Sequence, residues 1–252
     1  MIKSPIKWAG GKTFLIPKLI LDCDNQSPNN FVDVFTGSSV VALNMPCDNI
    51  IANDISYPLY VFHKCVKAGL VSCGNYNLSE QEYYTNRARF NEIKTSTTND
   101  VELATLFYYL NRAGFNGLYR ENSKGGFNVP WGKKKTFKSL SIDQAAYNKI
   151  QFFNKDYKNL TIPKNSLLYL DPPYDTPFTK YSKNDFTWED QKQVIEWAIN
   201  TGEKFIISNQ ATDRIVDLYN NYGLNTEIVM APRRISANGN RDKAKEVYTK
   251  NF

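Results

Sequence analysis

A chain of 252 residues can bury a sizeable core, and this length fits one α/β domain with an insertion, or two small domains, better than anything larger. The formal net charge of +6 indicates an anionic partner only if the basic residues gather in one part of the chain. No CxxC pair occurs among Cys23, Cys47, Cys65 and Cys73, and His63 is the single histidine, which argues against a zinc site and against Ser-His-Asp chemistry.

The first predicted strand covers residues 31–35 and stops at a Thr-Gly-Ser-Ser turn, after which residues 40–44 read as the start of a helix. Further strands are predicted over residues 49–52, 166–170 and 204–209. A helix over residues 188–200, with a capping segment at residues 187–190, precedes the last strand. Apolar strands that alternate with helices predict an α/β fold with a doubly wound, Rossmann-like parallel sheet.

Between the second and third predicted strands this alternation stops. Residues 58–69, 80–94 and 101–111 read as helices, and a segment rich in glycine, basic and aromatic residues follows them. We therefore expect an inserted, mainly helical domain with a β-hairpin over residues 58–144. The α/β domain would then consist of residues 1–57 and 145–252.

The tetrapeptide Asp171-Pro172-Pro173-Tyr174 follows the third predicted strand, where ligands of open α/β sheets bind. The Asp171 carboxylate and the Pro172 carbonyl are both hydrogen-bond acceptors, so they can hold the two N–H groups of an amine such as adenine N6. Two prolines stiffen the turn, and Tyr174 offers a ring on which a base can stack. These four residues are the predicted catalytic residues; a plain strand-ending turn is the alternative that the tetrapeptide alone leaves open.

A cofactor pocket is predicted from two segments near the N-terminus. Asp54 ends the second strand shortly after Gly37, and an acidic residue at that place commonly binds ribose hydroxyls. The paired glycines in residues 7–12 let the backbone approach a ligand, while Lys12 can pair with a carboxylate. Gly11-Lys12-Thr13 has the form of a P-loop end, but Ile6 replaces the first P-loop glycine, which argues against an NTPase.

With these parts together, the sequence resembles, nearly end to end, the Dam-like family of DNA adenine-N6 methyltransferases, in the group whose target recognition lies between the cofactor and catalytic motifs. The resemblance rests on residues 7–12, 35–37, 111–120, 127–133 and 171–174 and on Asp54. A late loop, Arg233-Arg234-Ile235-Ser236-Ala237-Asn238-Gly239, also matches and is expected to face DNA.

The resemblance implies S-adenosylmethionine as the cofactor. It assigns cofactor binding to Trp8, Ala9, Gly10, Gly11, Lys12, Phe35, Thr36, Gly37, Ser38, Ser39, Asp54, Ile55, Asp156, Tyr157 and Asp171. Ser39 departs from the family pattern, because many relatives have a second glycine there, and its side chain would narrow the loop.

Residues 112–138 contain seven basic residues and only one acidic residue, Glu121. Aromatic residues and glycines lie between the basic ones, a composition that suits a hairpin entering a DNA groove while cations bind phosphates. A solvated basic surface loop is the alternative that composition leaves open.

The resemblance also implies which residues bind DNA: Lys7, Arg112, Phe115, Asn116, Gly117, Leu118, Arg120, Asn122, Asn128, Pro130, Trp131, Lys133 and Lys134. Phe115 and Asn116 would fill the gap that a rotated base leaves, and Arg120 would read guanine. Leu118 with Pro130 would contact a thymine methyl group, and Lys7 would reach the first base pair. These positions favour the target GATC, although Lys134 replaces a tyrosine that is common in relatives.

We expect a site-specific, adenine-specific DNA methyltransferase, orphan or restriction-associated, that is a monomer in solution and can place two copies on double-stranded DNA. No stretch approaches the roughly 20 apolar residues that span a bilayer, and the N-terminus lacks a signal peptide's apolar core, so we expect a cytoplasmic protein, bacterial or from a phage acting in its host. We expect no metal and no membrane contact. One alternative is the same chemistry on a different DNA target or on RNA. Another is a protein amine methylase, and the basic aromatic segment argues against a protein substrate. A third is a DNA-binding relative without catalysis, and the intact Asp171 argues against it.

Overall fold

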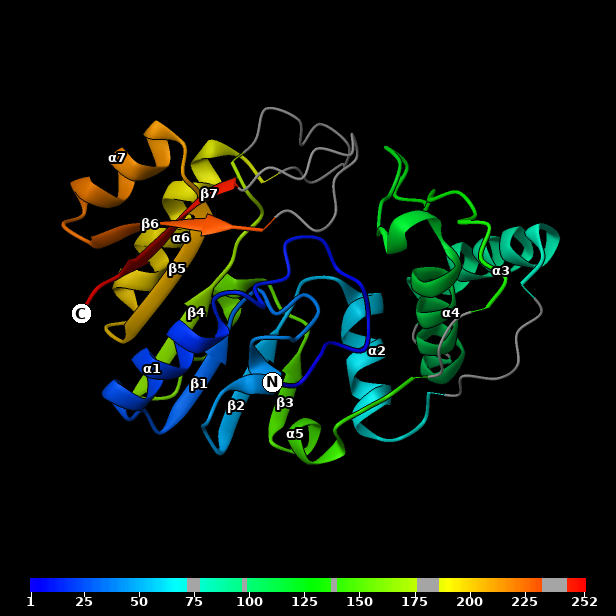
Figure 1. The fold of residues 1–252 in the computed structure, drawn as a ribbon, viewed down its shortest axis with the longest axis horizontal. Coiled ribbons are helices and arrows are strands. Elements are labelled where there is room, and N and C mark those ends of the chain that lie inside the picture. The colour runs from blue at the N-terminus through cyan, green and yellow to red at the C-terminus, as the bar shows by residue number, and fades with distance from the viewer. Residues whose placement is uncertain (72–77, 97–98, 137–139, 176–185, 233–243) are drawn as a thin grey trace.

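The computed structural model describes residues 1–71, 78–96, 99–136, 140–175, 186–232 and 244–252. Within them, seven strands form one sheet in the order β3-β2-β1-β4-β5-β7-β6 (Figure 1). The strands are β1 (Asn30–Asp33), β2 (Asn49–Asn53), β3 (Ile150–Phe153), β4 (Ser166–Leu170), β5 (Lys204–Gln210), β6 (Asn225–Ala231) and β7 (Ala244–Lys250). The first five are parallel, whereas β7 is antiparallel to both β5 and β6.

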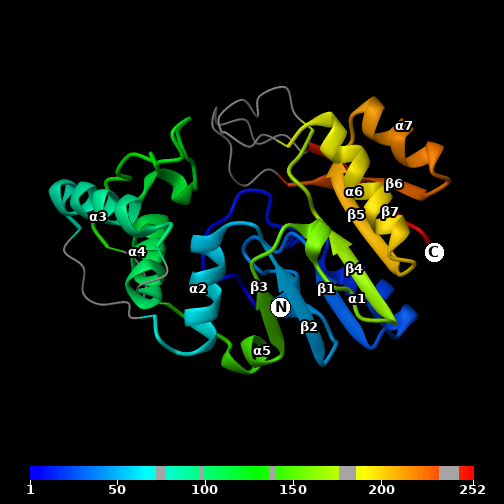
Figure 2. The same cartoon turned by 180° about the vertical axis from the view of Figure 1, so that it is seen from behind.

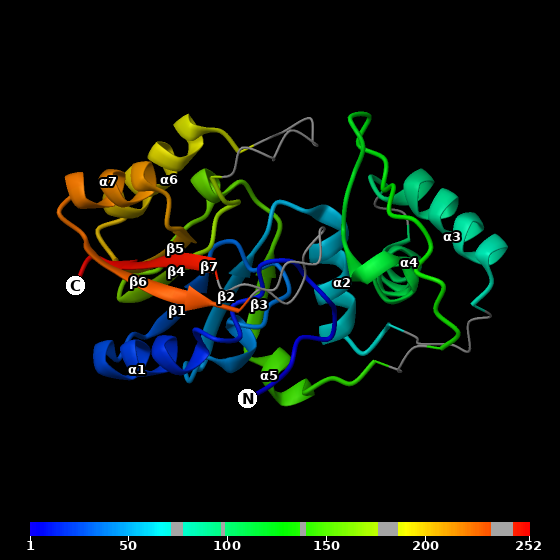
Figure 3. The same cartoon turned by 45° about the horizontal axis from the view of Figure 1, so that its top comes forward.

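Alternate residues of the central strands face two separate cores. Phe31 and Tyr169 point to the core that also contains helix α1 (Ile16–Gln26), whereas Val32 and Leu168 point to the core under α6 (Trp188–Asn200) and α7 (Asp213–Asn221). Figure 3 shows α1 on one face of the sheet and α6 and α7 on the other. Burial on both faces explains why these strands are continuous apolar runs.

The insertion packs beside the edge of the sheet at β3. Helix α2 (Tyr57–Lys67) contacts β3 and α5 (Gln144–Asn148) on one side and α4 (Asp100–Ala113) on the other, and α3 (Glu80–Ile93) packs on α4 (Figures 1 and 2). Helix α2 therefore belongs physically to both parts, because its buried residues join the same core as those of α4.

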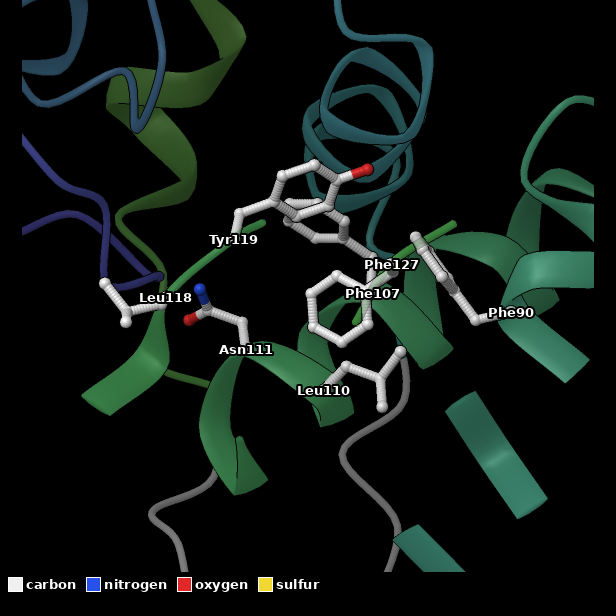
Figure 4. A pocket seen from close by; sticks show the side chains of 7 residues that line it. All are labelled: Phe90, Phe107, Leu110, Asn111, Leu118, Tyr119 and Phe127. Atoms are coloured by element: carbon white, nitrogen blue, oxygen red, sulfur yellow. The ribbon is translucent and has the colours of Figure 1, made fainter. Parts of the chain in front are cut away.

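The predicted recognition segment, residues 112–136, folds back over the end of α4. Residues after α4 fold back through two antiparallel bridges, Gly114 with Trp131 and Glu121 with Phe127, instead of through long strands. Only about 10 Å³ of cavity remains among the side chains there (Figure 4). This volume is at the lower limit for holding one water molecule, so the region is closely packed. The lining residues are Phe90, Phe107, Leu110, Asn111, Leu118, Tyr119 and Phe127.

The structure confirms the predicted strands at β2, β4 and β5 and the predicted helices at α2, α3, α4 and α6. Thr187 and Asp190 form the predicted capping box at the start of α6. The first strand ends at Asp33, two residues earlier than predicted, and the helix start predicted at residues 40–44 is only a 3₁₀ turn, Ala42–Asn44. Two further 3₁₀ turns are Phe115–Gly117 and Tyr157–Asn159.

Candidate active site and DNA-facing segment

Three strand ends bring the predicted site residues to one edge of the sheet. Asp33 on β1 is paired in register with Ala52 on β2 and with Tyr169 on β4. Two residues after each of these positions comes a predicted site residue: Phe35 after Asp33, Asp54 after Ala52, and Asp171 after Tyr169. The parallel register therefore brings an aromatic ring and the carboxylates of the predicted ribose-binding and catalytic residues to the carboxyl edge, as expected for an open α/β sheet.

Both oxygens of the Asp171 carboxylate have a fixed partner. Lys12 Nζ lies 2.7 Å from Oδ2, and the Ser208 hydroxyl donates to Oδ1 at 3.1 Å. Lys12 is 3% exposed and also donates to the Gly10 carbonyl at 2.6 Å. Burial raises the pKa of Asp171, while the charge of Lys12 and both hydrogen bonds lower it. A carboxylate can accept further bonds, so Asp171 can still receive an amine N–H.

The rest of the tetrapeptide is also held by buried groups. Gln191 Nε2 donates to the Pro173 carbonyl at 2.7 Å, and Lys12 Nζ lies 4.8 Å from the centre of the Tyr174 ring. Burial, and then the charges of Asp171 and Glu246, raise the pKa of the Tyr174 hydroxyl. Glu246 on β7 is itself 7% exposed, and burial raises the pKa of its carboxyl.

Asp54 supports the loop that follows β1. Its Oδ2 accepts the Gly37 N–H at 3.0 Å and its Oδ1 accepts the Ser56 N–H at 2.9 Å. Gly37 has φ +48°, and a Cβ atom there would lie 2.8 Å from Trp8 Nε1. Glycine is required at this position because a side chain would collide with the indole and strain the backbone.

Ser39, the departure from the family pattern, directs its side chain into the protein. Its φ is +56°, yet it is fully buried, and its hydroxyl lies 3.1 Å from Thr36 Oγ1 and 3.2 Å from His63 Nε2. Thr36 in turn donates to Asp33 Oδ2 at 2.9 Å. A buried hydrogen-bond chain therefore compensates for the unusual backbone conformation of Ser39.

His63 supports the same loop from below. The Gly37 carbonyl, 2.9 Å from Nε2, can only accept, so Nε2 carries the hydrogen and Nδ1 accepts from the Tyr147 hydroxyl at 3.1 Å. Burial lowers the pKa of His63 to about 4, and the ring is neutral at pH 7. The sequence predicts no role for this histidine, and its structural role is to hold the loop of residues 36–39.

The residues at this edge fit S-adenosylmethionine. Asp54 uses one lone pair of each oxygen within the protein and keeps acceptor capacity for ribose hydroxyls. The rings of Phe35 and Tyr157, 5.4 Å apart, offer an apolar surface for a base. Lys12 and Asp171 supply opposite charges for an amino-acid tail.

The other predicted cofactor residues lie around this edge. Ala9, Gly10 and Gly11 are exposed, Ser38 is buried, and Ile55 is 70% exposed. Asp156 caps the 3₁₀ turn Tyr157–Asn159 by accepting the Lys158 N–H, so its carboxylate is partly used within the protein.

The N-terminal segment and the recognition segment are joined by one buried amide. Asn111 accepts the Lys7 N–H at 3.0 Å and donates to the Lys7 carbonyl at 2.7 Å and the Gly117 carbonyl at 3.3 Å. A Cβ atom on Gly117 would lie 2.5 Å from Lys7 Cδ. Lys7 is thereby placed beside the predicted wedge, residues 115 and 116.

Most predicted DNA-binding side chains are exposed on one segment. Phe115 is 48% exposed, and Asn116 has φ +54° at the turn. Arg120 is exposed, and its Nε donates to Asn128 Oδ1 at 2.7 Å. Asn122 closes the loop by accepting two backbone N–H groups. Exposed Pro130, Lys133 and Lys134 follow, while Arg112, Leu118 and Trp131 are half-buried and Gly117 is buried.

Some predictions fall outside the described residues. The loop at residues 233–239 lies there, as do Lys138 and Cys73. Within the described ranges no group of three or more His, Cys, Asp or Glu side chains could hold a metal ion. In the same part of the chain no helix is both long and apolar enough to cross a bilayer.

The sequence did not predict three residues that surround the turn of residues 171–174, which are Gln191, Ser208 and Glu246. They come from α6, β5 and β7, and each is buried within hydrogen-bond or charge contact of residues 171–174. Ser208 could have been found, because it lies near the end of a correctly predicted strand. Gln191 and Glu246 carry no local sequence signal.

The sheet has a Rossmann-like methyltransferase fold, with the candidate site at its carboxyl edge. The chain belongs to the family described as D12 class N6 adenine-specific DNA methyltransferase, whose model matches residues 8–231.

Several relatives are similar over most of this chain. DNA adenine methylase of Vibrio cholerae is 33% identical over 96% of this chain and 93% of its own length. The Escherichia coli K12 protein of the same name is 33% identical over 94% and 91%. DNA N-6-adenine-methyltransferase of Escherichia phage P1 is 28% identical over 94% of this chain, which spans only 34% of the phage protein. A solved structure, Trm5b from Pyrococcus abyssi, covers 94% of this chain and 49% of its own at 12% identity and a TM-score of 0.33, too distant to support an argument.

Proposed function

We propose that this chain is a site-specific DNA methyltransferase that transfers a methyl group from S-adenosylmethionine to N6 of an adenine rotated out of duplex DNA, with GATC as the target. The observation that carries the proposal is the position of Asp171, whose two carboxylate oxygens are held by Lys12 and Ser208 beside a rigid Pro-Pro turn. Membership of an adenine-specific DNA methyltransferase family supports the same chemistry.

The proposed mechanism follows from hydrogen-bond geometry. The lone pair of adenine N6 is delocalised into the ring. The amine is therefore a poor nucleophile until hydrogen-bond acceptors hold both of its N–H groups. Asp171 and the Pro172 carbonyl each accept one N–H, which turns the lone pair out of conjugation. Tyr174 stacks against the base. Bound S-adenosylmethionine supplies an electrophilic methyl carbon, and Asp171 takes the proton that becomes acidic on transfer.

DNA recognition is proposed for the segment that joins α4 to residue 136. Exposed Phe115 and Asn116 would occupy the space that the adenine leaves, and Arg120, whose direction is restrained by Asn128, would read guanine O6 and N7. Leu118 and Pro130 would meet a thymine methyl group, and Lys7 would reach the first base pair. Lys133, Lys134 and Arg112 would contact phosphates.

Organisation and context complete the proposal. We assign cofactor binding and catalysis to residues 1–57 and 145–252 and target recognition to residues 58–144, with α2 as the shared element. We expect a monomer in solution, two copies on a palindromic duplex, no metal requirement, and action in the cytoplasm of a bacterium or of a phage host.

Radiolabelled S-adenosylmethionine and matched duplexes test the target. One duplex contains GATC, a second permutes the same four base pairs, and an RNA duplex of the same sequence is the third substrate. We expect label only in the first. Equal labelling of the permuted duplex would reject GATC, labelling of RNA would reject the substrate class, and an enzyme that labels nothing would reject the activity.

A further inference from the structure

The catalytic turn is held by a chain of two buried amides that reaches it from α6 and β5. Gln191 is 1% exposed, and its Nε2 donates to the Pro173 carbonyl at 2.7 Å. Its Oε1 accepts from Asn209 Nδ2 at 2.9 Å, and Asn209 is fully buried. Neither residue lies in a predicted catalytic or binding motif.

The direction of both amides is fixed by a backbone group. Asn209 Oδ1 accepts the Gln210 N–H at 2.8 Å, so the Nδ2 donor of Asn209 must face Gln191. Gln191 then presents Oε1 to Asn209 and Nε2 to Pro173. Reversal of either amide would place two acceptors or two donors against each other.

The hydrogen bond from Gln191 is important because a proline has no N–H that a sheet or helix could use to hold it in place. Asp171 is held through its carboxylate, and Pro173 is held through its carbonyl. The peptide group that carries the Pro172 carbonyl lies between these two fixed points. The proline rings restrict the φ angles of Pro172 and Pro173 on either side of it.

We infer that Gln191, oriented by Asn209, is a positioning residue that sets the direction of the Pro172 carbonyl toward adenine N6. This inference rests on the proposed function. A displaced acceptor would misalign the amine without removing any group that touches the cofactor or the DNA.

Gln191→Met, which keeps the length of the side chain and removes its donor, tests the inference. We expect kcat to fall roughly tenfold to a hundredfold, as a small misplacement at a reacting centre can cause, while KM for S-adenosylmethionine and Kd for DNA stay within about twofold. Gln193→Met is the matched control, because Gln193 lies on the same helix and contacts Lys158 instead of the turn. That control should keep wild-type kcat.

Asn209→Asp provides a second variant in which Gln191 itself is unchanged. An aspartate cannot donate to Gln191 Oε1, so the Gln191 amide should reverse and turn its oxygen toward Pro173. We expect the same loss of kcat, at a temperature well below the melting midpoint of each variant. Turnover equal to that of Gln193→Met in both variants would overturn the inference, whereas a wild-type enzyme without turnover would instead reject the proposed function.

Two cysteines lie together near the start of β2, at the edge of the sheet opposite the candidate site. Cys23, near the end of α1, and Cys47, just before β2, place their Sγ atoms 3.4 Å apart. Both are buried and free, and they line a polar hollow together with Asp24, Asn29 and Asp48. The hydrogen bond between them lowers the pKa of the Cys47 thiol and raises that of the Cys23 thiol.

We propose that Cys23 and Cys47 form a dithiol site that reacts with a small disulfide such as oxidised glutathione. The Cys47 thiolate attacks one sulfur of the oxidant and releases one glutathione thiol. Cys23 then attacks Cys47 Sγ, its proton passes to solvent, and the second glutathione leaves. The product is a protein disulfide that closes the segment carrying β1 and the cofactor loop, and two thiols of glutathione are formed.

Peptide mass mapping after treatment of the full chain with oxidised glutathione tests this site. We expect a Cys23–Cys47 cross-link, a glutathione adduct trapped on Cys47 in Cys23→Ser, and no adduct on Cys23 in Cys47→Ser. Cys65→Ser is the control and should cross-link normally, since Cys65 is buried elsewhere, beside Asp100. Unmodified Cys23 and Cys47 in the folded protein, or a cross-link that requires Cys65, would overturn the proposal.

Discussion

The ammonium group of Lys12 lies 2.7 Å from the carboxylate of Asp171, although 159 positions separate the two residues in the sequence. The pair is largely buried, so water contributes little to the solvation of either charge. Each charge therefore depends on the other, since breaking a buried ion pair leaves an uncompensated charge. This contact joins the segment of residues 7–12 to the turn of residues 171–174.

Lys12→Met should move the acidic limb of the kcat–pH profile to higher pH. The charge of Lys12 lowers the pKa of Asp171 against the effect of burial, and turnover needs the ionised carboxylate. Removing the cation therefore raises that pKa. The kcat–pH profiles of the wild type, Lys12→Met and the surface control Lys18→Met are measured at saturating S-adenosylmethionine. Acidic limbs that coincide in all three proteins would contradict this prediction.

Asp33→Asn and His63→Gln should change the pH dependence of stability in opposite directions. Burial first, and the charges of Asp171 and Asp54 in addition, raise the pKa of Asp33 from 3.8 to about 7. The folded protein keeps this proton after the unfolded chain has lost it, so its stability contribution is present below pH 3.8 and is lost as the pH rises to 7.

His63 has the reverse sign. Its pKa falls from 6.5 to about 4 on burial, so its contribution is present above pH 6.5 and is lost as the pH falls to 4. As the pH rises from 4 to 7, the free energy of unfolding of Asp33→Asn should increase relative to that of the wild type. As the pH falls from 6.5 to 4, the free energy of unfolding of His63→Gln should decrease less than that of the wild type. Urea unfolding across this range measures both slopes; parallel curves would contradict the two assignments.

Arg120→Ala should reduce discrimination at one base pair, at a cost of about 1–3 kcal/mol on the preferred duplex. Arg120 is exposed and restrained by Asn128, an arrangement suited to a base edge. Lys134→Ala, by contrast, should weaken all duplexes alike and reduce the salt slope by about one. Binding isotherms on GATC and permuted duplexes at several salt concentrations distinguish them, and equal weakening by Arg120→Ala would make it a phosphate contact.

Gly117→Ala should weaken DNA binding and leave cofactor binding intact. Gly117 has φ +68°, and an added Cβ would lie 2.5 Å from Lys7 Cδ and 3.1 Å from the Asn111 carbonyl oxygen. Lys7 must then leave its place beside the recognition segment. Gly125→Ala is the matched control, with φ +79° but no atom within 4 Å of the new Cβ. Equal DNA affinity of the two variants would contradict this placement of Lys7.

The sequence was sufficient to predict the elements that carry continuous apolar runs or strong helix caps. Strand β4 and helix α6 match the predicted bounds, because both have one clear period and a defined end. Strand β6 was not predicted because most of its residues are exposed. Strand β7 was not predicted because polar residues interrupt its few apolar ones. Of the described strands, only β7 runs antiparallel to the others, and its place between β5 and β6 has no local signature in the sequence.

The same limit applies to the site. Asp171 and Asp54 follow strands and could be found from their position. Gln191 lies within an ordinary helix and Glu246 within a polar strand, and only the tertiary fold brings them to the turn of residues 171–174. The pairing of Ser39 with His63 likewise depends on the packing of α2 against the loop of residues 36–39.

Nucleoside mass spectrometry of duplex DNA after incubation with S-adenosylmethionine tests the central claim most directly. We expect N6-methyldeoxyadenosine with the wild-type enzyme, and at least a hundredfold less with Asp171→Asn when both proteins are saturated with S-adenosylmethionine, since removal of one preorganised group costs about 10²–10³ in rate. Methylation of another atom, or equal product from Asp171→Asn, would contradict it.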